Sequence, residues 1–395
     1  MGMFFSEGGA RVEKVVYLDH AATSWPKPPE VVQAIVDAME HAGANAGRGN
    51  HSLAMGSGRV LVRTRSALAE LFGVKNAQDI AFTHNTTMSL NMAIHGLLHP
   101  GDHVISTMTE HNSVRRPLEY LRKTKGIDVD YVKVDSEGRL DLRELESLFQ
   151  SRTRMVICSH SSNLLGSILP IGEIGEIARR HKSVFLVDAA QSAGAVDIDV
   201  QTMNIDMLAF PGHKGLLGPQ GTGGLYISPE VDLEPLMQGG TGSQSENSEQ
   251  PNIRPDKYEA GTQNGVGIAG LLAGVQKVRS IGTRAIYEHE WGLVQYLMDG
   301  LSGIRGITML GPAAGRERTG LLSFVIEGEE MAQVAHRLDR EYGIAVRSGM
   351  HCSPLAHQSA GTLESGAVRA SVGVSTTRED VETMVNAMKE MFGRR

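Results

Sequence analysis

The chain of 395 residues is long enough to form two domains, each with its own hydrophobic core. Charged residues make up 21% and hydrophobic residues 41%, which is typical of a globular protein and excludes a disordered or fibrous chain. The formal net charge of −7 gives no indication of nucleic acid or an anionic membrane as a partner, and no apolar run approaches the roughly 20 residues of a membrane-spanning helix. Residues 1–14 contain Glu7 and Glu13 and lack an apolar signal core, so we expect a cytoplasmic protein.

Between residues 79 and 227, short β-branched runs alternate with amphipathic stretches of helical length. This alternation predicts an α/β fold, with a mostly parallel seven-stranded sheet covered by helices. The predicted strands are residues 79–83, 103–107, 129–134, 155–160, 184–188, 206–210 and 223–227. The predicted helices are residues 87–98, 113–125, 141–150 and 171–181.

Residues 239–256 are polar and rich in Gly, Ser, Glu and Gln, without helical or strand periodicity. Two interpretations stay open: a flexible surface loop, or a lid or subunit-crossing segment beside a functional site. A long helical region begins near residue 277 and is followed by strands 321–327, 344–347 and 368–372 and helices 330–342 and 377–392. We therefore predict a large domain of residues 18–276 and a smaller C-terminal α+β domain of residues 277–395, to which residues 1–17 also belong.

An aspartate and a lysine, Asp188 and Lys214, each follow a predicted strand. The amine of a lysine can condense with the aldehyde of pyridoxal phosphate (PLP), and a buried carboxylate can keep the pyridine nitrogen of PLP protonated, so that the ring withdraws electrons. Each residue alone has an ordinary alternative, a helix-capping aspartate or an exposed lysine. Their order along the chain, with Asn163 upstream, favours PLP as the cofactor.

Other polar residues also follow predicted strands, and ligands of parallel sheets bind beyond the carboxyl ends of the strands. Thr86 and Thr87 open a helix, where they suit a phosphate or serve as a simple N-cap. Thr262, in a glycine turn, is a second candidate hydroxyl for a phosphate. His111 is either a hydrogen-bonded loop residue or a ring that stacks on a planar cofactor and moves protons.

Arginines supply the candidate anion-binding groups. Arg369 lies in an apolar strand, where its partner is either a substrate carboxylate or an internal ion pair. Arg318, within a charged run, is expected in a solvated loop, and Arg63 and Arg65 are expected on a helix face.

The two cysteines do not make a disulfide framework. Cys158 lies in an apolar strand and is expected in the core. Cys352 lies in a loop with Gly, Pro and basic neighbours, surroundings that favour a reactive thiolate. The spacing of Cys and His predicts no metal site.

These motifs resemble those of a known family. The most specific are residues 187–191, 212–214, 259–262 and 344–349, the last leading to His351 and Cys352. From residue 17 to the C-terminus, the chain resembles the class V branch of the fold-type I PLP enzymes, and within it the cysteine desulfurases and selenocysteine lyases. The short segment around Cys352 is similar to that of type II desulfurases.

The resemblance implies a role for each matching residue. Lys214 would hold PLP, and Cys352 would accept sulfur. The other cofactor contacts would be Asp188 to the pyridine nitrogen, Gln191 to the ring hydroxyl, His111 to the ring face, and Thr87, His213 and the partner subunit's Thr262 to the phosphate. The substrate would be positioned by Asn163, Arg48 and Arg369. Because Thr262 would cross between subunits, the resemblance also implies a homodimer.

The resemblance further implies the reaction: L-cysteine becomes L-alanine, and a persulfide forms on Cys352 for transfer to a protein acceptor, such as a scaffold for iron–sulfur assembly. Alternatives are an L-selenocysteine lyase, another class V reaction such as racemisation or transamination, and a non-catalytic sulfur-relay protein. Three positions depart from the family pattern. Pro211 replaces a Ser or Thr, and Gly47 and Met350 stand where histidines are frequent.

Overall fold

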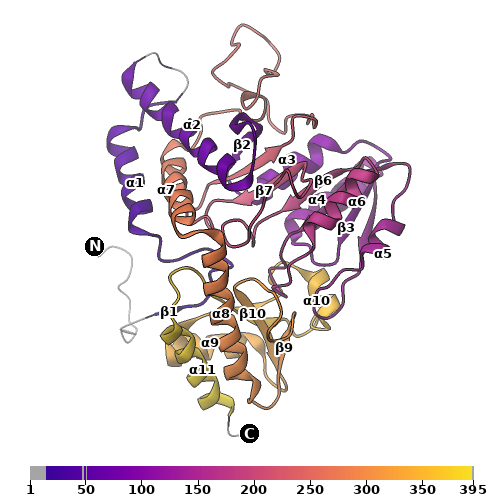
Figure 1. The fold of residues 1–395 in the computed structure, drawn as a ribbon, viewed down its shortest axis with the longest axis vertical. Coiled ribbons are helices and arrows are strands. Elements are labelled where there is room, and N and C mark those ends of the chain that lie inside the picture. Colours follow the sequence, from indigo (N-terminus) through magenta and orange to yellow (C-terminus); the bar gives the residue numbers. More distant parts are fainter. Residues whose placement is uncertain (1–14, 47–48, 50, 394–395) are drawn as a thin grey trace.

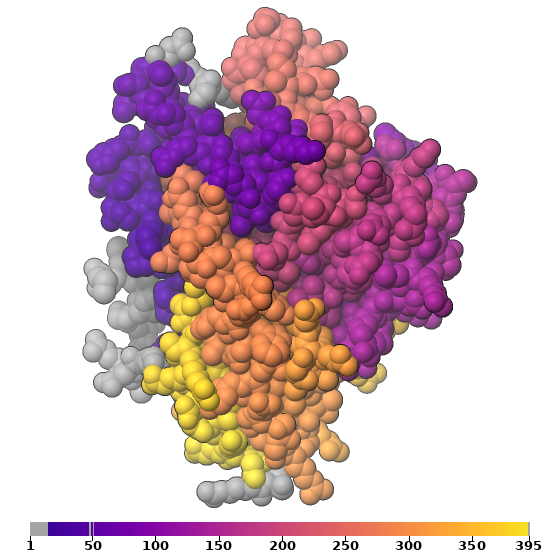
Figure 2. Space-filling view, in the orientation of Figure 1, coloured from indigo at the N-terminus to yellow at the C-terminus, as the bar shows by residue number. Residues whose placement is uncertain are grey.

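A computed structural model describes residues 15–46, 49 and 51–393. Figure 1 shows a central sheet with helices around it, and the C-terminal elements gathered at one end of the molecule in orange and yellow. Figure 2 shows that these two parts form one continuous body. None of the described helices is both long and apolar enough to cross a bilayer.

The central sheet has seven strands in the order β2-β8-β7-β6-β5-β3-β4. Only β8 runs against its neighbours, and the other six strands are parallel to one another. The predicted α/β fold with a mostly parallel seven-stranded sheet is therefore confirmed. The strands are β2 (Ile80–Thr83), β3 (His103–Thr107), β4 (Asp128–Val132), β5 (Thr153–Ser159), β6 (Val184–Asp188), β7 (Met207–Pro211) and β8 (Gly223–Ile227).

Helices cover both faces of this sheet because successive side chains of a strand point to opposite faces. In β5, Val156 and Cys158 join one apolar cluster, whereas Met155 and Ile157 join another. Cys158 is fully buried, as predicted. The helices of this part are α1 (Pro29–His41), α2 (Ser52–Phe72), α3 (Thr86–Leu97), α4 (Asn112–Lys125), α5 (Leu142–Ser147), α6 (Ile171–Arg180) and α7 (Gly265–Ile281), with short 3-10 turns η1 (Ala77–Asp79) and η2 (Asp256–Tyr258).

A second, antiparallel sheet forms the C-terminal part, in the order β12-β13-β10-β9. Its strands are β9 (Ile307–Leu310), β10 (Leu321–Ile326), β12 (Arg347–Gly349) and β13 (Ala367–Ser371). Its helices are α8 (Thr283–Ser302), α9 (Met331–Tyr342), α10 (Pro354–Ala360) and α11 (Arg378–Phe392). The predicted strand 344–347 is divided into β11 (Ile344–Ala345) and β12.

The N-terminal segment packs on the C-terminal part, since β1 (Val16–Tyr17) pairs in parallel with β11. This pairing is compatible with assigning residues 1–17 to the smaller domain. The division at residues 276 and 277 remains our proposal. It falls within α7, whose C-terminus is followed by Gly282 at a φ of 90° and then by α8.

The segment 239–255 contains no helix or strand, and most of its residues are exposed. In Figure 1 it projects beyond the helices that surround the sheet. Both interpretations of this segment, surface loop and subunit-crossing segment, are compatible with that position.

The prediction for Arg318 was wrong, whereas the prediction that Arg65 lies on a helix is confirmed. Arg318 is fully buried rather than solvated, and its guanidinium donates to four backbone carbonyls, including those of Pro312 at 2.7 Å and Leu165 at 3.1 Å. Arg65 does lie on a helix, α2, but it faces inward and forms a buried ion pair with Glu259 at 2.5 Å. Both arginines are buried because their donors have fixed acceptors, which offsets the cost of removing a charge from water.

Candidate active site

Eight predicted site residues surround one cavity at the carboxyl ends of β5, β6 and β7. They are Thr86, Thr87, His111, Asn163, Asp188, Gln191, His213 and Lys214. The parallel strands produce this convergence, because each ends at the same edge of the sheet and is followed by a loop or a helix start.

Asp188 and Lys214 supply the two charged groups of this cavity. Asp188 ends β6, and its Oδ1 accepts a hydrogen bond of 2.9 Å from the backbone N–H of Ala190. Burial raises the pKa of Asp188 to about 6. Burial and the nearby guanidinium of Arg369 lower the pKa of Lys214 to about 8. An amine with such a pKa is partly uncharged near neutral pH, as a nucleophile or a proton acceptor must be.

His111 precedes α4 and caps its N-terminus. Its Nδ1 accepts a hydrogen bond of 3.0 Å from the backbone N–H of Ser113, so the ring proton is on Nε2. Burial first, and then the charge of Lys214, lowers the pKa of His111 to about 4. The ring is therefore neutral at pH 7, which suits a flat surface against which a cofactor can stack.

The N-terminus of α3 opens toward the same cavity. Asn85 caps this helix through Met88, while the hydroxyl of Thr86 is buried and has no partner among the described residues. Thr87 exchanges a hydrogen bond of 2.8 Å with Ser113. A helix N-terminus with a spare hydroxyl is a favourable place for a phosphate.

Of the remaining predicted site residues that the structure describes, Thr262, Arg369 and Cys352 do not line this cavity. Thr262 lies in a separate pocket with Glu259 and Asn264. Arg48 lies outside the described residues. Within this one chain, Thr262 therefore does not belong to the group around Lys214.

Arg369 lies in β13 and is almost fully buried. Its Nη2 pairs with Asp19 at 3.0 Å, and its Nη1 donates to the backbone carbonyl of Asn163 at 2.9 Å. Its Nε has no partner among the described residues. The internal ion pair, one of the two alternatives for Arg369, thus exists, and the Nε–H is left as an unpaired donor among the described residues.

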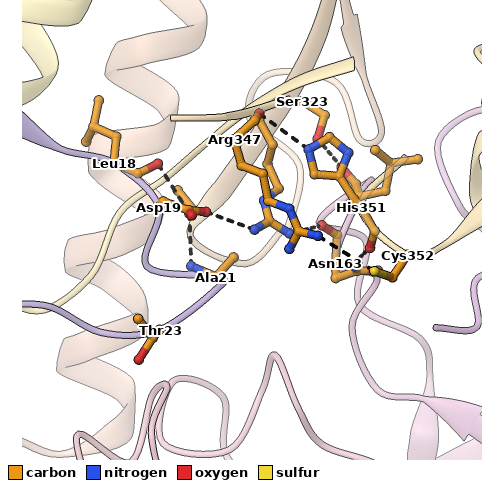
Figure 3. A network of polar contacts seen from close by, with 12 residues as sticks. Leu18, Asp19, Ala21, Thr23, Asn163, Ser323, Arg347, His351 and Cys352 are labelled. Carbon is orange, nitrogen blue, oxygen red and sulfur yellow. Dashed lines mark hydrogen bonds and ion pairs between the residues drawn. The ribbon is translucent and has the colours of Figure 1, made fainter. Parts of the chain in front are cut away.

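Cys352 is exposed and lies in a short segment, residues 350–353, which we call the cysteine loop. Figure 3 shows this loop beside Asn163 and Arg347, in a polar network that extends to Asp19. The guanidinium Nη2 of Arg347 lies 3.7 Å from the sulfur of Cys352. Arg347 thus contacts the sulfur of Cys352 directly.

Sequence reasoning missed two contributors to the site. Asp19 is the ion-pair partner of Arg369, 350 positions away in the sequence. Glu110 is fully buried next to His111, and its carboxylate accepts from the backbone N–H and hydroxyl of Ser159, a residue of the cavity wall. The run of a threonine, a glutamate and His111 was a signal for Glu110, and Asp19 falls in the segment where the family resemblance begins, although no role was assigned to it.

A second cavity adjoins the first and shares Ala190, Gln191 and Lys214 with it. Glu290 and His20 both line it. A side chain on Gly320 would collide with the carboxylate of Glu290. Glycine at that position therefore leaves room for a buried acid beside the Lys214 site.

Burial alone raises the pKa of Glu290 from its ordinary value to about 8. At pH values between about 5 and 8, the folded chain thus retains a proton that the unfolded chain releases, so the free energy of unfolding falls as pH rises. We expect Glu290→Gln to remove this loss of unfolding free energy. The variant should be more stable than the wild type by on the order of a few kcal/mol at pH 8 and hardly more stable at pH 5. Melting temperatures at the two pH values measure this difference.

Glu288→Gln is the matched control, because Glu288 lies on the same helix but is exposed and paired with Arg284 at 2.8 Å. It should not reproduce the pH-dependent gain. Equal melting temperatures for the wild type and Glu290→Gln at pH 8 would contradict the prediction.

The profile of the Aminotransferase class-V family matches residues 16–384, nearly the whole chain. The chain belongs to the class-V aminotransferase family. A relative from Methanothermobacter thermautotrophicus, named "Probable cysteine desulfurase", is 39% identical over 96% of this chain and 95% of its own length. A "Cysteine desulfurase" from Haloferax volcanii is 34% identical over 96% of this chain and 90% of its own length.

Solved structures give the same result for the fold. The apo structure of a cysteine desulfurase from Thermococcus onnurineus is 35% identical and superimposes with a TM-score of 0.91, covering 96% of this chain and 95% of that one. A cysteine desulfurase from Escherichia coli, solved as an S-sulfonic acid, is 28% identical with a TM-score of 0.86 and the same coverage. The predicted fold-type I architecture is therefore confirmed.

Class-V aminotransferases are PLP-dependent enzymes, and the residues around the cavity fit that cofactor. The buried carboxyl of Asp188 and the amine of Lys214 line the same cavity. The unpartnered hydroxyl of Thr86 lies at a helix N-terminus. Pro211 leaves one candidate phosphate hydroxyl absent, but it does not close the cavity, which it helps to line.

Proposed function

We propose that the protein is a PLP-dependent cysteine desulfurase, which converts L-cysteine into L-alanine and accepts the sulfur on Cys352. The observation that carries this proposal is the position of Cys352. Its sulfur is exposed beside the guanidinium of Arg347, and its carbonyl accepts a hydrogen bond of 2.8 Å from Asn112, which follows His111 directly. The reactive thiol thus lies next to the cofactor residues, and the names of the relatives agree with this activity.

In this proposal Lys214, Asp188 and Gln191 hold PLP, and Thr86, Thr87 and His213 contact its phosphate. When bound, PLP withdraws electrons from the α-carbon of the substrate. The amine of Lys214, with its lowered pKa, accepts the α-proton and returns it later. The neutral ring of His111 covers one face of the site.

Substrate orientation follows from Arg369 and Asn163. The free Nε–H of Arg369 is a donor for the substrate carboxylate, and the ion pair with Asp19 fixes the guanidinium plane. Arg48 is the third proposed substrate contact. Because Asn163 also donates to the carbonyl of His351, a substrate held in this way would lie near the cysteine loop.

Sulfur transfer is then a displacement at the substrate sulfur. The thiolate of Cys352 attacks that sulfur, the carbon–sulfur bond breaks, and its electron pair stays on the carbon fragment, which takes up protons to become alanine. A persulfide remains on Cys352. Because this residue is exposed, a protein acceptor can reach the persulfide.

We also propose a homodimer. Thr262 lines a different pocket from that of Lys214 in its own chain, so its proposed phosphate contact requires the site of a second subunit. Helices α1 and α2, in the indigo part of Figure 2, carry exposed apolar side chains. The exposed side chains are Val32, Val36, Met39, Leu53, Met55 and Val62. A second copy of the chain would cover such a surface.

The deciding experiment supplies PLP-loaded protein with L-cysteine and a thiol reductant and quantifies L-alanine and sulfide together. Equal amounts of both products are the expected result. A parallel reaction with L-selenocysteine compares selenide release. Turnover of selenocysteine alone would replace the proposed activity with that of a selenocysteine lyase, and alanine from neither substrate would indicate another class V reaction.

A further inference from the structure

The cysteine loop has an unfavourable backbone conformation. His351 and Cys352 have φ angles of 49° and 59°, in the left-handed region that non-glycine residues rarely occupy. A residue with a side chain is strained in this conformation, because its Cβ lies close to the backbone carbonyl oxygen. Contacts from outside the loop must therefore hold Cys352 in place.

Asn163 provides two such contacts, although its expected role was substrate binding. Its amide Nδ2 donates to the backbone carbonyl of His351 at 2.7 Å, and its Oδ1 accepts from the hydroxyl of Ser353. The two hydrogen bonds bracket Cys352, one on the residue before it and one on the residue after it. The three residues joined by these hydrogen bonds, Asn163, His351 and Ser353, are buried.

The hydroxyl of Ser353 has a different role from the one its position suggests. Ser353 is the N-cap residue of α10, where a serine hydroxyl ordinarily accepts from a backbone N–H of the first turn. No such capping bond exists here. The hydroxyl donates to Asn163 instead, and because an oxygen must accept that bond, the amide nitrogen of Asn163 is directed at His351.

Asn163 also belongs to the substrate side of the site. It lines the cavity of Lys214, and its backbone carbonyl accepts from Arg369, the proposed carboxylate contact. An amide nitrogen has two N–H donors, and His351 occupies one of them. The position of the cysteine loop is thus tied to the residue that faces the substrate.

We propose that Ser353 is a positioning residue for Cys352, acting through the side-chain amide of Asn163. The expected consequence, faster sulfur transfer, rests on the proposed desulfurase function. The contact between Ser353 and the cysteine loop can be tested without turnover. Removing the hydroxyl lets the amide of Asn163 rotate, releases the carbonyl of His351, and lets Cys352 leave its strained conformation.

Alkylation by iodoacetamide measures the loop directly in the PLP-loaded protein, because the other cysteine, Cys158, is fully buried. We expect Ser353→Ala to change the alkylation rate of Cys352 by about tenfold, the ratio that the loss of one hydrogen bond produces. Ser353→Thr, which keeps the hydroxyl, should restore the wild-type rate. Ser359→Ala is the matched control, since that hydroxyl only contacts the carbonyl of Leu355 in its own helix.

Turnover separates positioning from a general structural effect. Ser353→Ala should lower kcat for L-cysteine by about tenfold while the cofactor absorbance stays unchanged, since Ser353 itself does not line the cavity of Lys214. An unchanged alkylation rate in Ser353→Ala, or an equal change in Ser359→Ala, would overturn the proposal. Failure of the desulfurase assignment would show differently, as absent turnover in the wild type with the alkylation difference intact.

Discussion

Replacing Lys214 with alanine is expected to lower the production of alanine from L-cysteine by roughly 10⁴-fold. Two losses coincide in this variant, the covalent attachment of PLP and the base that moves the α-proton. The side chain of Lys214 is buried beside Asp188, and the residues that line this cavity include no second lysine. Alanine release over time measures the rate, and the visible absorbance of the protein reports whether the cofactor is still attached to a lysine.

Lys123→Ala is the control for this experiment, because Lys123 lies exposed on α4. It should retain both the absorbance and the rate of the wild type. Retention of a lysine-attached cofactor in Lys214→Ala would show that another amine binds PLP. Lys214→Arg should be as inactive as the alanine variant, since a guanidinium keeps the charge but neither condenses with the aldehyde nor accepts a proton at neutral pH.

Much of the fold was predictable because local patterns determine it. In a parallel sheet buried on both faces, each strand is a β-branched run, and each crossover needs a helix, so the alternation is visible in the sequence. The strands 103–107, 184–188 and 223–227 were predicted with their observed bounds. The division of the predicted strand 344–347 into β11 and β12 was not predicted, because β11 pairs with β1 whereas β12 joins the four-stranded sheet.

The cavity residues were also predictable, since strand ends in a parallel sheet share one edge. Contacts between distant segments were not. Arg369 has an ordinary strand position, and its partner Asp19 is identified only once β13 lies beside the N-terminal segment. Arg318 was expected in a solvated loop, and the inward direction of Arg65 was not predicted, because a sequence shows a charge but not the carboxylate or carbonyls that receive it.

The role of Asn163 shows the same limit at the site itself. Its position after a strand correctly indicated the cavity. Its hydrogen bonds to the cysteine loop join residues about 190 positions apart, and no local pattern encodes them. Sequence reasoning therefore identified the chemical groups, whereas the structure was needed to connect Cys352 with the substrate subsite.

Replacing Cys352 with alanine is expected to abolish sulfide production from L-cysteine, leaving less than about one part in 10³ of the wild-type rate, because no other exposed thiol can attack the substrate sulfur. Binding of PLP should be unchanged, since Cys352 contacts Arg347 and Asn112 rather than the residues proposed to hold the cofactor. Sulfide and alanine are quantified in the presence of a thiol reductant, with cofactor absorbance measured in the same samples.

Cys158→Ala is the matched control, because it removes the other thiol from the core of the sheet without altering the site. It should keep the wild-type ratio of sulfide to alanine, with at most some loss of stability from the small cavity created. Selenocysteine provides a second comparison, because selenium leaves carbon more readily than sulfur and its release does not require attack by a thiolate. If Cys352→Ala released sulfide at the wild-type rate, the proposed persulfide on Cys352 would be contradicted. If it lost sulfide release but kept selenide release, the thiol of Cys352 would be required for breaking the carbon–sulfur bond.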